Sequence, residues 1–443
     1  MTTTYDPLHP KYLVEADLRE EMTRVYDLCH GCRLCFKFCS SFPTLFEFID
    51  ADPKQDAATM TPAQQDQIVD ECFQCKLCYV NCPYIPGQSE WDLDFPRLMM
   101  RAEQVLHSTR KRPVKERVTD FALGHTDLTG RVGSALAPLA NKTIETPNSL
   151  PRKLIESTAG IAAERVLSPF ARTRFSTWFK KRTPKLARPE RERVALFPTC
   201  LVEYQDTRTG KDLVQVYEHN GIACELPAGE VCCGAPVLHQ GDIEGFVKNA
   251  RTNIKILASW IRSEQRRGGN PAVVVPQPTC GYILKKDYVD YVGGPDAELV
   301  AEHSFDAAEY LMKVHREDKA AGGEGLDADF TGHIPETTTY HAPCHLRAQN
   351  VGLKSRDLLK LTGTKITVVA ECSGIDGTWG LREENLQASR KVATKMAAAI
   401  KKANSEAVAG DCSLANGGIV LETGTQPVHP LSQMARSYGL PED

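Results

Sequence analysis

The chain has 443 residues, with 53 Lys and Arg against 57 Asp and Glu, for a formal net charge of −4. This length allows several domains, and the near-balance of charge does not favour nucleic-acid binding. The polar first residues contain no apolar signal segment, and no run approaches the roughly 18 apolar residues that cross a bilayer. We therefore expect neither a secreted disulfide scaffold nor an integral membrane protein, and the 16 cysteines predict metal or redox chemistry in the cytoplasm.

Two runs of four cysteines share the spacing C-x2-C-x2-C-x3-C: CHGCRLCFKFC at residues 29–39 and CFQCKLCYVNCP at residues 72–83. In two-cluster ferredoxins, three cysteines of such a run ligate one [4Fe–4S] cluster and the fourth ligates the other cluster. This rule assigns the first cluster to Cys29, Cys32, Cys35 and Cys82, and the second to Cys72, Cys75, Cys78 and Cys39. Structural zinc, the alternative, usually pairs two short hooks across a longer loop and fits this spacing poorly.

Helices are expected around these two runs. Thr61 and Pro62 are a suitable N-cap and first helical residue, and residues 93–106 form a helical pattern with Pro96 near its start. The spacer of 32 residues between the runs is too long for a compact hairpin. Residues 1–110 therefore resemble the α-helical ferredoxin domain of respiratory iron–sulfur subunits, not the small β-rich ferredoxin.

A stretch without cysteine follows, and part of it is strongly basic. Residues 152–193 hold 12 Lys and Arg against 4 Asp and Glu. Five apolar side chains recur there at roughly helical spacing: Leu167, Phe170, Phe175, Trp178 and Phe179. Such a helix lies on an anionic membrane surface or packs against its own domain or a partner. We predict that residues 111–192 form a basic helical linker that docks on a membrane or a partner.

The C-terminal half contains an internal repeat. Each copy has three β-rich landmarks that lead to a cysteine: residues 193–201, 224–236 and 272–284 in the first copy, and residues 337–346, 367–377 and 406–418 in the second. A helical stretch precedes the third landmark in both copies, at residues 243–266 and 383–402. Strands that alternate with helices predict α/β units on a mainly parallel sheet, with ligands beyond the carboxyl ends of the strands. We expect one unit at 193–300, a connector at 301–336 and a second unit at 337–443.

The cysteine pattern of this half resembles a known family. The duplicated C…CCG…C-x-x-C pattern is similar to that of heterodisulfide reductase B-type subunits, and together with the N-terminal runs it resembles the D-type subunits. The C subunit of anaerobic glycerol-3-phosphate dehydrogenase and the glycolate oxidase iron–sulfur subunit are similar too. HAPCHLRAQNVG, ECSGIDGTWG and DCSLAN look most like the glycerol-3-phosphate dehydrogenase subunit. The resemblance implies an α plus α/β multidomain fold, in which an α-helical ferredoxin domain precedes two α/β cysteine-rich units.

Each unit departs from the five-cysteine motif that the resemblance implies. The first keeps Cys200, Cys232, Cys233 and Cys280, with Gln277 at the remaining position. The second keeps Cys344, Cys372 and Cys412, with Ser373 and Ala415 at the other two positions. Four thiolates are enough for a third [4Fe–4S] cluster. Three require a fourth ligand or a three-iron cluster, unless that unit has lost its cluster; the candidates for a fourth ligand are His341, His345 and Asp411. Cys224 lies outside the motif and is expected to be a buried apolar residue.

The sequence contains no dinucleotide-binding, P-loop or haem-attachment motif. Oxidation of a metabolite by two electrons needs a cofactor such as flavin to divide them, because each cluster carries one electron. We therefore expect an electron-transfer subunit that accepts electrons from a partner flavoprotein dehydrogenase. It would pass them to a quinone, a quinone-reducing partner or another carrier, in the cytoplasm or peripherally on the cytoplasmic face of the inner membrane.

Two alternatives stay open at this point. One is catalysis of the disulfide-reductase type at the C-terminal cluster. The other is service as the redox partner of a soluble peroxide- or oxygen-reducing protein. The sequence assigns no catalytic residue, and whether the chain is itself an enzyme stays open.

Overall fold

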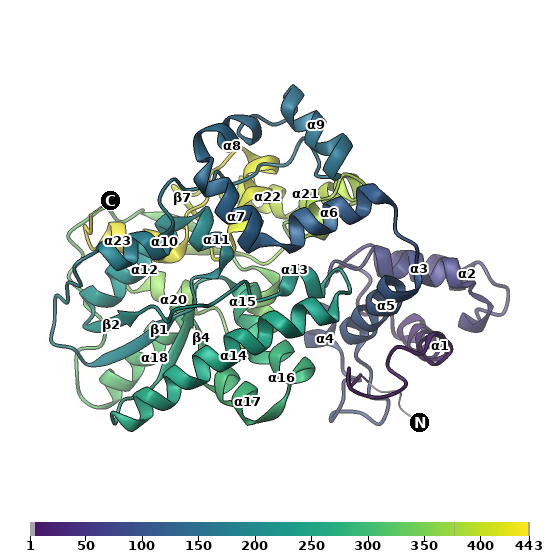
Figure 1. The fold of residues 1–443 in the computed structure, drawn as a ribbon, viewed down its shortest axis with the longest axis horizontal. Helices are drawn as coiled ribbons and strands as arrows, with labels where there is room; N and C mark the ends of the chain where they lie inside the picture. The colour runs from purple at the N-terminus through teal and green to yellow at the C-terminus, as the bar shows by residue number, and fades with distance from the viewer. Residues whose placement is uncertain (1–4, 376, 442–443) are drawn as a thin grey trace.

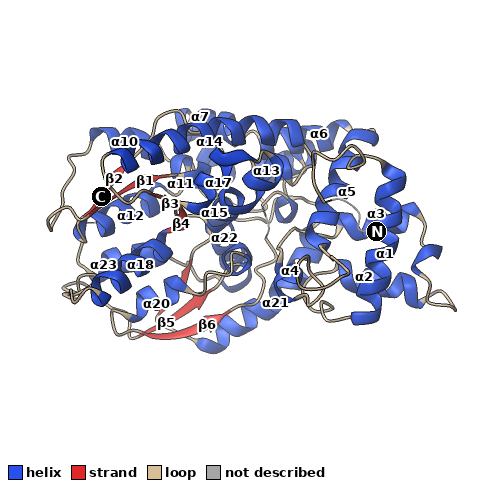
Figure 2. Cartoon of the chain, turned by 90° about the horizontal axis from the view of Figure 1, so that it is seen from below, coloured by secondary structure: helices blue, strands red, loops and turns tan. Residues whose placement is uncertain are grey.

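The computed structural model describes residues 5–375 and 377–441. A helical region at the N-terminus forms one end of the molecule, and two separate parallel sheets with their helices form the remainder (Figure 1). Figure 2 shows the first helices gathered at one end and both sets of strands toward the other. The expected combination of a helical region with parallel α/β units is therefore observed.

The N-terminal region consists of α-helices with one short 3₁₀ turn, Ala57–Thr59. The helices are α1 (Glu15–Cys32), α2 (Ser41–Asp50), α3 (Pro62–Asp70), α4 (Leu77–Asn81) and α5 (Phe95–Thr109). A capping box between Thr61 and Gln64 begins α3, and the Asp94 carboxylate accepts a hydrogen bond from the Arg97 amide at the start of α5. Both helices that the sequence predicted are therefore confirmed.

Five helices follow: α6 (Val114–Gly124), α7 (Thr126–Ala135), α8 (Ala137–Ile144), α9 (Leu150–Ala159) and α10 (Phe175–Lys181). The aromatic residues of the basic segment face inward. Phe175 is fully buried, and Trp178 and Phe179 pack against the core beneath it. Arg182 lies over the Phe179 ring and pairs with Glu218 at 2.6 Å. Of the two interpretations of this stripe, packing against its own domain is the one observed.

Apolar side chains are exposed instead on the four helices before it, which form an arch along one edge of the molecule (Figure 1). We call these residues the α6–α9 apolar face: Val114, Val118, Phe121, Leu128, Val132, Leu136, Leu139, Leu150 and Leu154. Leu150 is 84% exposed and Val114 74% exposed. In each helix they recur at intervals of three or four residues, which places them on one side.

The first α/β unit contains a four-stranded parallel sheet in the order β2-β1-β3-β4. Its strands are β1 (Glu192–Leu196), β2 (Ile222–Glu225), β3 (Ala272–Val275) and β4 (Ser304–Asp306). Its helices are α11 (Thr199–Tyr204), α12 (Thr207–His219), α13 (Ala235–Leu238), α14 (Ile243–Arg266), α15 (Pro278–Tyr282), α16 (Tyr288–Tyr291) and α17 (Gly294–Glu302), with a π-helical turn at Ile283–Asp287. Strand β4 falls within the range 301–336 that we expected to be connector.

The second unit repeats this plan with three parallel strands in the order β6-β5-β7. Its strands are β5 (Thr337–His341), β6 (Lys365–Val369) and β7 (Ala407–Gly410). Its helices are α19 (Cys344–Ala348), α20 (Lys354–Lys360), α21 (Leu386–Ala403), α22 (Ser413–Thr423) and α23 (Pro430–Ser437), with a 3₁₀ turn at Trp379–Leu381, and α18 (Ala307–Ala320) links the units. In both units the first strand lies between the second and the third, so the sequence repeat is also a repeat of topology.

The two units share one hydrophobic core. Val194 of β1, Tyr340 of β5 and Leu431 of α23 belong to a single buried cluster. Residues that follow the carboxyl ends of β1, β3, β5 and β7 include Cys200, Cys280, Cys344 and Cys412. In the described ranges, no helix is long and apolar enough to cross a membrane.

Candidate metal centres

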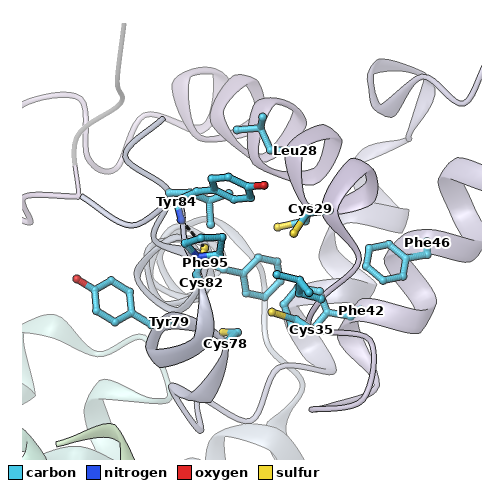
Figure 3. Close-up of a pocket in the computed structure, with 14 residues that line it drawn as sticks. Leu28, Cys29, Cys35, Phe42, Phe46, Cys78, Tyr79, Cys82, Tyr84 and Phe95 are labelled. Carbon is cyan, nitrogen blue, oxygen red and sulfur yellow. Dashed lines mark hydrogen bonds between the residues drawn. The ribbon is translucent and has the colours of Figure 1, made fainter. Parts of the chain in front are cut away.

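The first predicted ligand set lines one cavity in the helical region. Cys29, Cys32, Cys35 and Cys82 contribute to its wall, together with apolar and aromatic side chains. In Figure 3 the labelled sulfurs of Cys29, Cys35 and Cys82 surround a common space. The Tyr84 amide donates a hydrogen bond to the Cys82 sulfur at 3.4 Å, which stabilises negative charge there.

Burial keeps the thiols of Cys29, Cys35 and Cys82 protonated when no metal is bound. It raises the pKa of Cys35 to about 12 and also raises the pKa of Cys29 and of Cys82. Thiolates are the ligands of iron–sulfur clusters, so binding of a cluster must release these protons. Several thiols around one apolar cavity are the donor set that such a cluster requires.

The second predicted set lines a neighbouring cavity that contains Cys39, Cys72, Cys75 and Cys78. Phe42, Cys78 and Phe95 line both this cavity and the first one. The rings of Phe42 and Phe95 lie 4.6 Å apart between centroids. The two sites of the helical region are therefore separated by a single layer of side chains.

Both cysteine runs have a left-handed residue at the same position. The residue after the second cysteine has left-handed geometry in each, Arg33 with φ 55° and Lys76 with φ 63°. Such geometry is uncommon for residues other than glycine and is often found at functional sites. The Lys76 side chain is buried, donates to Gln74 at 2.7 Å and brings positive charge close to Cys75. No sequence pattern indicated this buried lysine.

In the first α/β unit, the four predicted cysteines form a continuous chain of contacts. The sulfurs of Cys233 and Cys280 lie 3.2 Å apart, and Cys232 contacts both Cys200 and Cys233. Hydrogen bonds from Cys200 and Cys233 lower the pKa of Cys232. Cys200 follows Thr199, which has left-handed backbone geometry with φ 67°. The sequence set is therefore brought together as a group of four thiols.

Residues from outside the unit cover this group. The Asp127 carboxylate, at the start of α7, accepts a hydrogen bond from the Cys232 amide at 2.8 Å. Helix α7 lies in the segment that we expected to be a linker, so that segment contributes to the site. Sequence reasoning missed Asp127, because nothing in its local pattern indicates a contact 105 residues away.

In the second unit, Cys344, Cys372 and Cys412 line one cavity. Cys75 of the helical region and Phe73 line it as well, although both also line the second cavity of that region. The Cys344 thiol contacts Cys372 and Cys75, and its hydrogen bond lowers the pKa of Cys75. The site of the second unit therefore lies directly against the second site of the helical region.

The three candidate oxygen or nitrogen ligands have different surroundings. His341 and His345 line the same cavity, whereas Asp411 does not. Asp411 accepts a hydrogen bond from the Tyr340 hydroxyl at 2.6 Å and another from Ser355. All three side chains are buried.

Gln277 and Ser373 occupy two positions where the family motif has cysteine. The Gln277 side chain is buried and forms two hydrogen bonds with Ser413, which follows Cys412. It donates to the Ser413 hydroxyl at 2.8 Å and accepts from the Ser413 amide at 3.1 Å. Ser373 lines the cavity of the second unit. Among the described residues, no three Cys, His, Asp or Glu side chains converge tightly enough to hold a single metal ion. The ligands of a cubane bind different iron atoms and surround a volume rather than a point.

Known proteins match this chain in its cysteine-rich half and beyond. The sequence matches the cysteine-rich domain CCG twice, at residues 194–285 and 338–414. The chain is 28% identical to the C subunit of the anaerobic glycerol-3-phosphate dehydrogenase of Escherichia coli over 350 residues, which cover 78% of this chain and 82% of that protein.

Two further relatives match over shorter ranges. The B subunit of the fumarate reductase (CoM/CoB) of Methanothermobacter marburgensis is 27% identical over 225 residues, 50% of this chain and 40% of that protein. The lactate utilization protein A of Bacillus pumilus is 28% identical over 196 residues, 43% of this chain and 75% of that protein. The chain therefore contains two copies of the cysteine-rich CCG domain, and over most of its length it is similar to the C subunit of an anaerobic glycerol-3-phosphate dehydrogenase.

Proposed function

We propose that this chain is an iron–sulfur electron-transfer subunit, which accepts electrons from a flavoprotein dehydrogenase and passes them to a quinone or another carrier. The observation that carries the proposal is the sharing of cavity walls. Cys78 lines both cavities of the helical region, and Cys75 lines both the second of these and the cavity of the second unit. Three cysteine sites so arranged form a path along which single electrons can pass.

The path extends to the first unit as well. Pro278 and Thr279 line the cavity of the second unit, and the next residue, Cys280, belongs to the thiol group of the first unit. His345 of the second unit connects the first unit with the helical region. Its ring forms hydrogen bonds with the Thr279 hydroxyl at 2.8 Å and with the Gln74 carbonyl at 2.8 Å. Contacts of this kind hold the sites at constant separation, as rapid electron transfer between them requires.

The relatives support a partner subunit. Two of them are named as subunits of a dehydrogenase and of a reductase. A cluster exchanges one electron at a time, so a donor that loses two electrons needs a flavin or a similar cofactor to divide them. We assign that step to the partner, and we place this chain in the cytoplasm or on the cytoplasmic face of the inner membrane.

Metal analysis of anaerobically purified full-length protein tests the proposal. The two N-terminal sites predict about eight iron atoms with equal acid-labile sulfide, and a cluster in the first unit raises the total to about twelve. A cluster in the second unit raises it to about fifteen or sixteen. Fewer than about six iron atoms, or zinc in their place, would contradict the proposal, as would failure of the reduced protein to pass electrons to a quinone or another one-electron acceptor.

The α6–α9 apolar face is our candidate for the peripheral contact with the membrane. Four exposed basic residues lie in or next to the same helices in the sequence and form no ion pair with another described residue: Lys111, Arg117, Lys142 and Lys153. Exposed apolar side chains bordered by basic residues suit an anionic lipid surface, because burial in the interface and attraction to the headgroups act together.

Sedimentation with vesicles tests this contact. We expect the protein to bind vesicles that contain phosphatidylglycerol more strongly than vesicles of phosphatidylcholine alone. A variant with Leu136→Ser, Leu139→Ser and Leu150→Ser should lose most of this binding. Leu8→Ser, at a leucine that is 73% exposed outside the face, is the matched control and should bind normally. If the triple variant bound these vesicles as strongly as the wild type does, the proposed membrane contact through this face would be contradicted.

A further inference from the structure

The site of the second unit has one thiol fewer than the site of the first unit. Cys344, Cys372 and Cys412 line its cavity, and a cluster held by protein at each of four iron atoms needs another ligand. The identity of this ligand rests on the proposed function, since it concerns the same series of clusters. The candidate side chains are all buried, but they differ in their hydrogen bonds.

Two of the three candidates already accept hydrogen bonds at the atoms that could bind iron. The Asp411 carboxylate accepts hydrogen bonds from Tyr340 and Ser355, and it does not line the cavity. His345 has partners at both ring nitrogens. Because a carbonyl only accepts, Nε2 of His345 carries the hydrogen toward Gln74, and Nδ1 accepts the hydrogen bond of the Thr279 hydroxyl.

His341 is different in this respect. It is the last residue of β5, is 2% exposed and lines the cavity beside the three cysteines. Its Nε2 atom lies 3.0 Å from the carbonyl oxygen of Glu371, so this nitrogen carries the hydrogen. Its Nδ1 atom is buried and has no hydrogen-bond partner among the described residues. A buried nitrogen with a free lone pair is costly unless something binds it.

We infer that the second unit holds an iron–sulfur cluster with three cysteine ligands and one histidine ligand, and that the histidine ligand is Nδ1 of His341. Metal-binding histidines usually donate their other ring hydrogen to a carbonyl or carboxylate, which fixes the tautomer and the orientation of the ring. The Glu371 carbonyl, directly before Cys372, performs that task here. Burial lowers the pKa of His341 to about 4, so the ring is neutral at physiological pH.

The histidine ligand determines whether the reduction potential of this cluster is higher or lower than that of its neighbours. A neutral imidazole in place of a thiolate makes a cluster less negative, and histidine ligation raises the reduction potential of iron–sulfur centres. Cys75 contacts Cys344, so this higher-potential site lies against the second N-terminal cluster. Electrons that enter the helical region therefore have a favourable destination in the second unit.

Two other groups line the same cavity and could bind in place of His341. They are Cys75 and Ser373. Cys75 also lines the cavity of the second N-terminal cluster, where it is the ligand expected from the spacing. Neither group would contribute nitrogen to the coordination, which is the basis for distinguishing them from His341.

The experiment uses full-length protein labelled with ¹⁵N-histidine, purified anaerobically and studied by pulsed EPR during a redox titration. We expect one cluster signal with the strong coupling of a directly bound nitrogen, and we expect Cys412→Ser to remove that signal. His341→Cys should keep the iron content, abolish the nitrogen coupling and shift the midpoint potential of that cluster to a lower value. His333→Gln, at an exposed histidine, should change none of these.

The outcomes separate the inference from the proposed function. Cluster signals without nitrogen coupling, or coupling that persists in His341→Cys, would overturn the histidine ligand and leave electron transfer intact. Loss of a cluster signal in Ser373→Ala, with no nitrogen coupling in the wild type, would assign the ligand to Ser373. Absence of every cluster signal would refute the proposed function and the inference together. If His341→Cys does not fold, the labelled wild type and Cys412→Ser still show whether a histidine binds this cluster, and His345→Gln, which should keep the nitrogen coupling, distinguishes His341 from the other histidine that lines the cavity.

Discussion

The two CCG units share a sheet order and a core but surround their cysteines differently. In the first, four thiols touch one another in a continuous chain, and Asp127 from α7 covers them. In the second, three thiols line a cavity together with His341 and with Cys75 from the helical region, and Cys344 contacts both Cys372 and Cys75. The same sheet order supports two different sets of side chains at the carboxyl ends of the strands. The residues that form the sheets are therefore distinct from those that would bind the clusters.

Removal of a cysteine should have the largest effect. Cys233 contacts both Cys232 and Cys280, so Cys233→Ser should remove the cluster of the first unit and about four iron atoms. Cys372→Ser should remove only the iron of the second unit. Cys224→Ser is the matched control, because Cys224 is buried in β2 outside either group. Iron and sulfide analysis measures the losses, and an equal loss in the control would mean that these cysteines act through folding alone.

The glycine that follows Cys232–Cys233 in the first unit and Cys372–Ser373 in the second should matter in both units, but more in the second. Gly234 and Gly374 both have left-handed backbone geometry, with φ 92° and 69°. Any other residue there costs about 1–2 kcal/mol. An added methyl group would meet the Phe246 ring at 2.6 Å in the first unit and the Ser389 carbonyl oxygen at 2.1 Å in the second.

Because a ring can move more easily than a backbone carbonyl, Gly374→Ala should destabilise the protein more than Gly234→Ala does. Urea unfolding of both variants, each compared with wild type, measures the difference. Gly363→Ala is the control, since its φ is also positive and nothing lies within 4 Å of the added methyl group. Equal midpoints for all three variants would show that backbone geometry alone sets the cost.

Acid should weaken the contact between the units through His429. Its Nε2 atom, in the second unit, lies 3.1 Å from the Pro276 carbonyl of the first. Burial lowers its pKa from 6.5 to about 4. The unfolded chain therefore binds a proton near pH 6.5 that the folded chain does not bind until about pH 4. The contribution of His429 is fully present above pH 6.5 and is lost as pH falls toward 4, by up to about 3 kcal/mol.

His429→Gln keeps a hydrogen-bond donor but does not titrate. We expect its unfolding free energy to fall less than that of wild type between pH 7 and pH 4.5, as measured by urea titration at both values. An unchanged pH dependence would mean that His429 stays neutral in both states or is protonated in both. His333→Gln, at a histidine that is 71% exposed, should retain the wild-type slope.

Loss of Gln277 should have the smallest effect. Its side chain accepts a hydrogen bond from the Ser413 amide at 3.1 Å and donates to the Ser413 hydroxyl at 2.8 Å. Gln277→Ala leaves a partly buried amide without a partner, at a cost of about 1–2 kcal/mol. Thermal unfolding measures the cost, and Gln67→Ala at an exposed helix position is the control. A larger loss, with loss of iron, would indicate that Gln277 holds Cys412 in place.

Local spacing in the sequence was enough for the cysteine runs and for the main secondary structure. Cys29, Cys32 and Cys35 lie within one turn and loop, so their number and spacing already indicate a shared centre. The strands near residues 193, 272 and 337 and the helix at 243–266 were predictable because apolar periodicity and capping residues act over a few positions. The repeat made the common order of the two sheets predictable as well.

Only the tertiary structure decided which distant residues meet. Cys75 contacts Cys344 from 269 positions away, and the free nitrogen of His341 depends on where the Glu371 carbonyl lies. The sequence left the apolar stripe at residues 167–179 either on a membrane surface or packed against its own domain or a partner, whereas the structure buries Phe175 and exposes the α6–α9 apolar face. Apolar periodicity shows that a helix has an apolar side and a polar side. Which side becomes core depends on the surface that packs against it, and that surface comes from elsewhere in the chain.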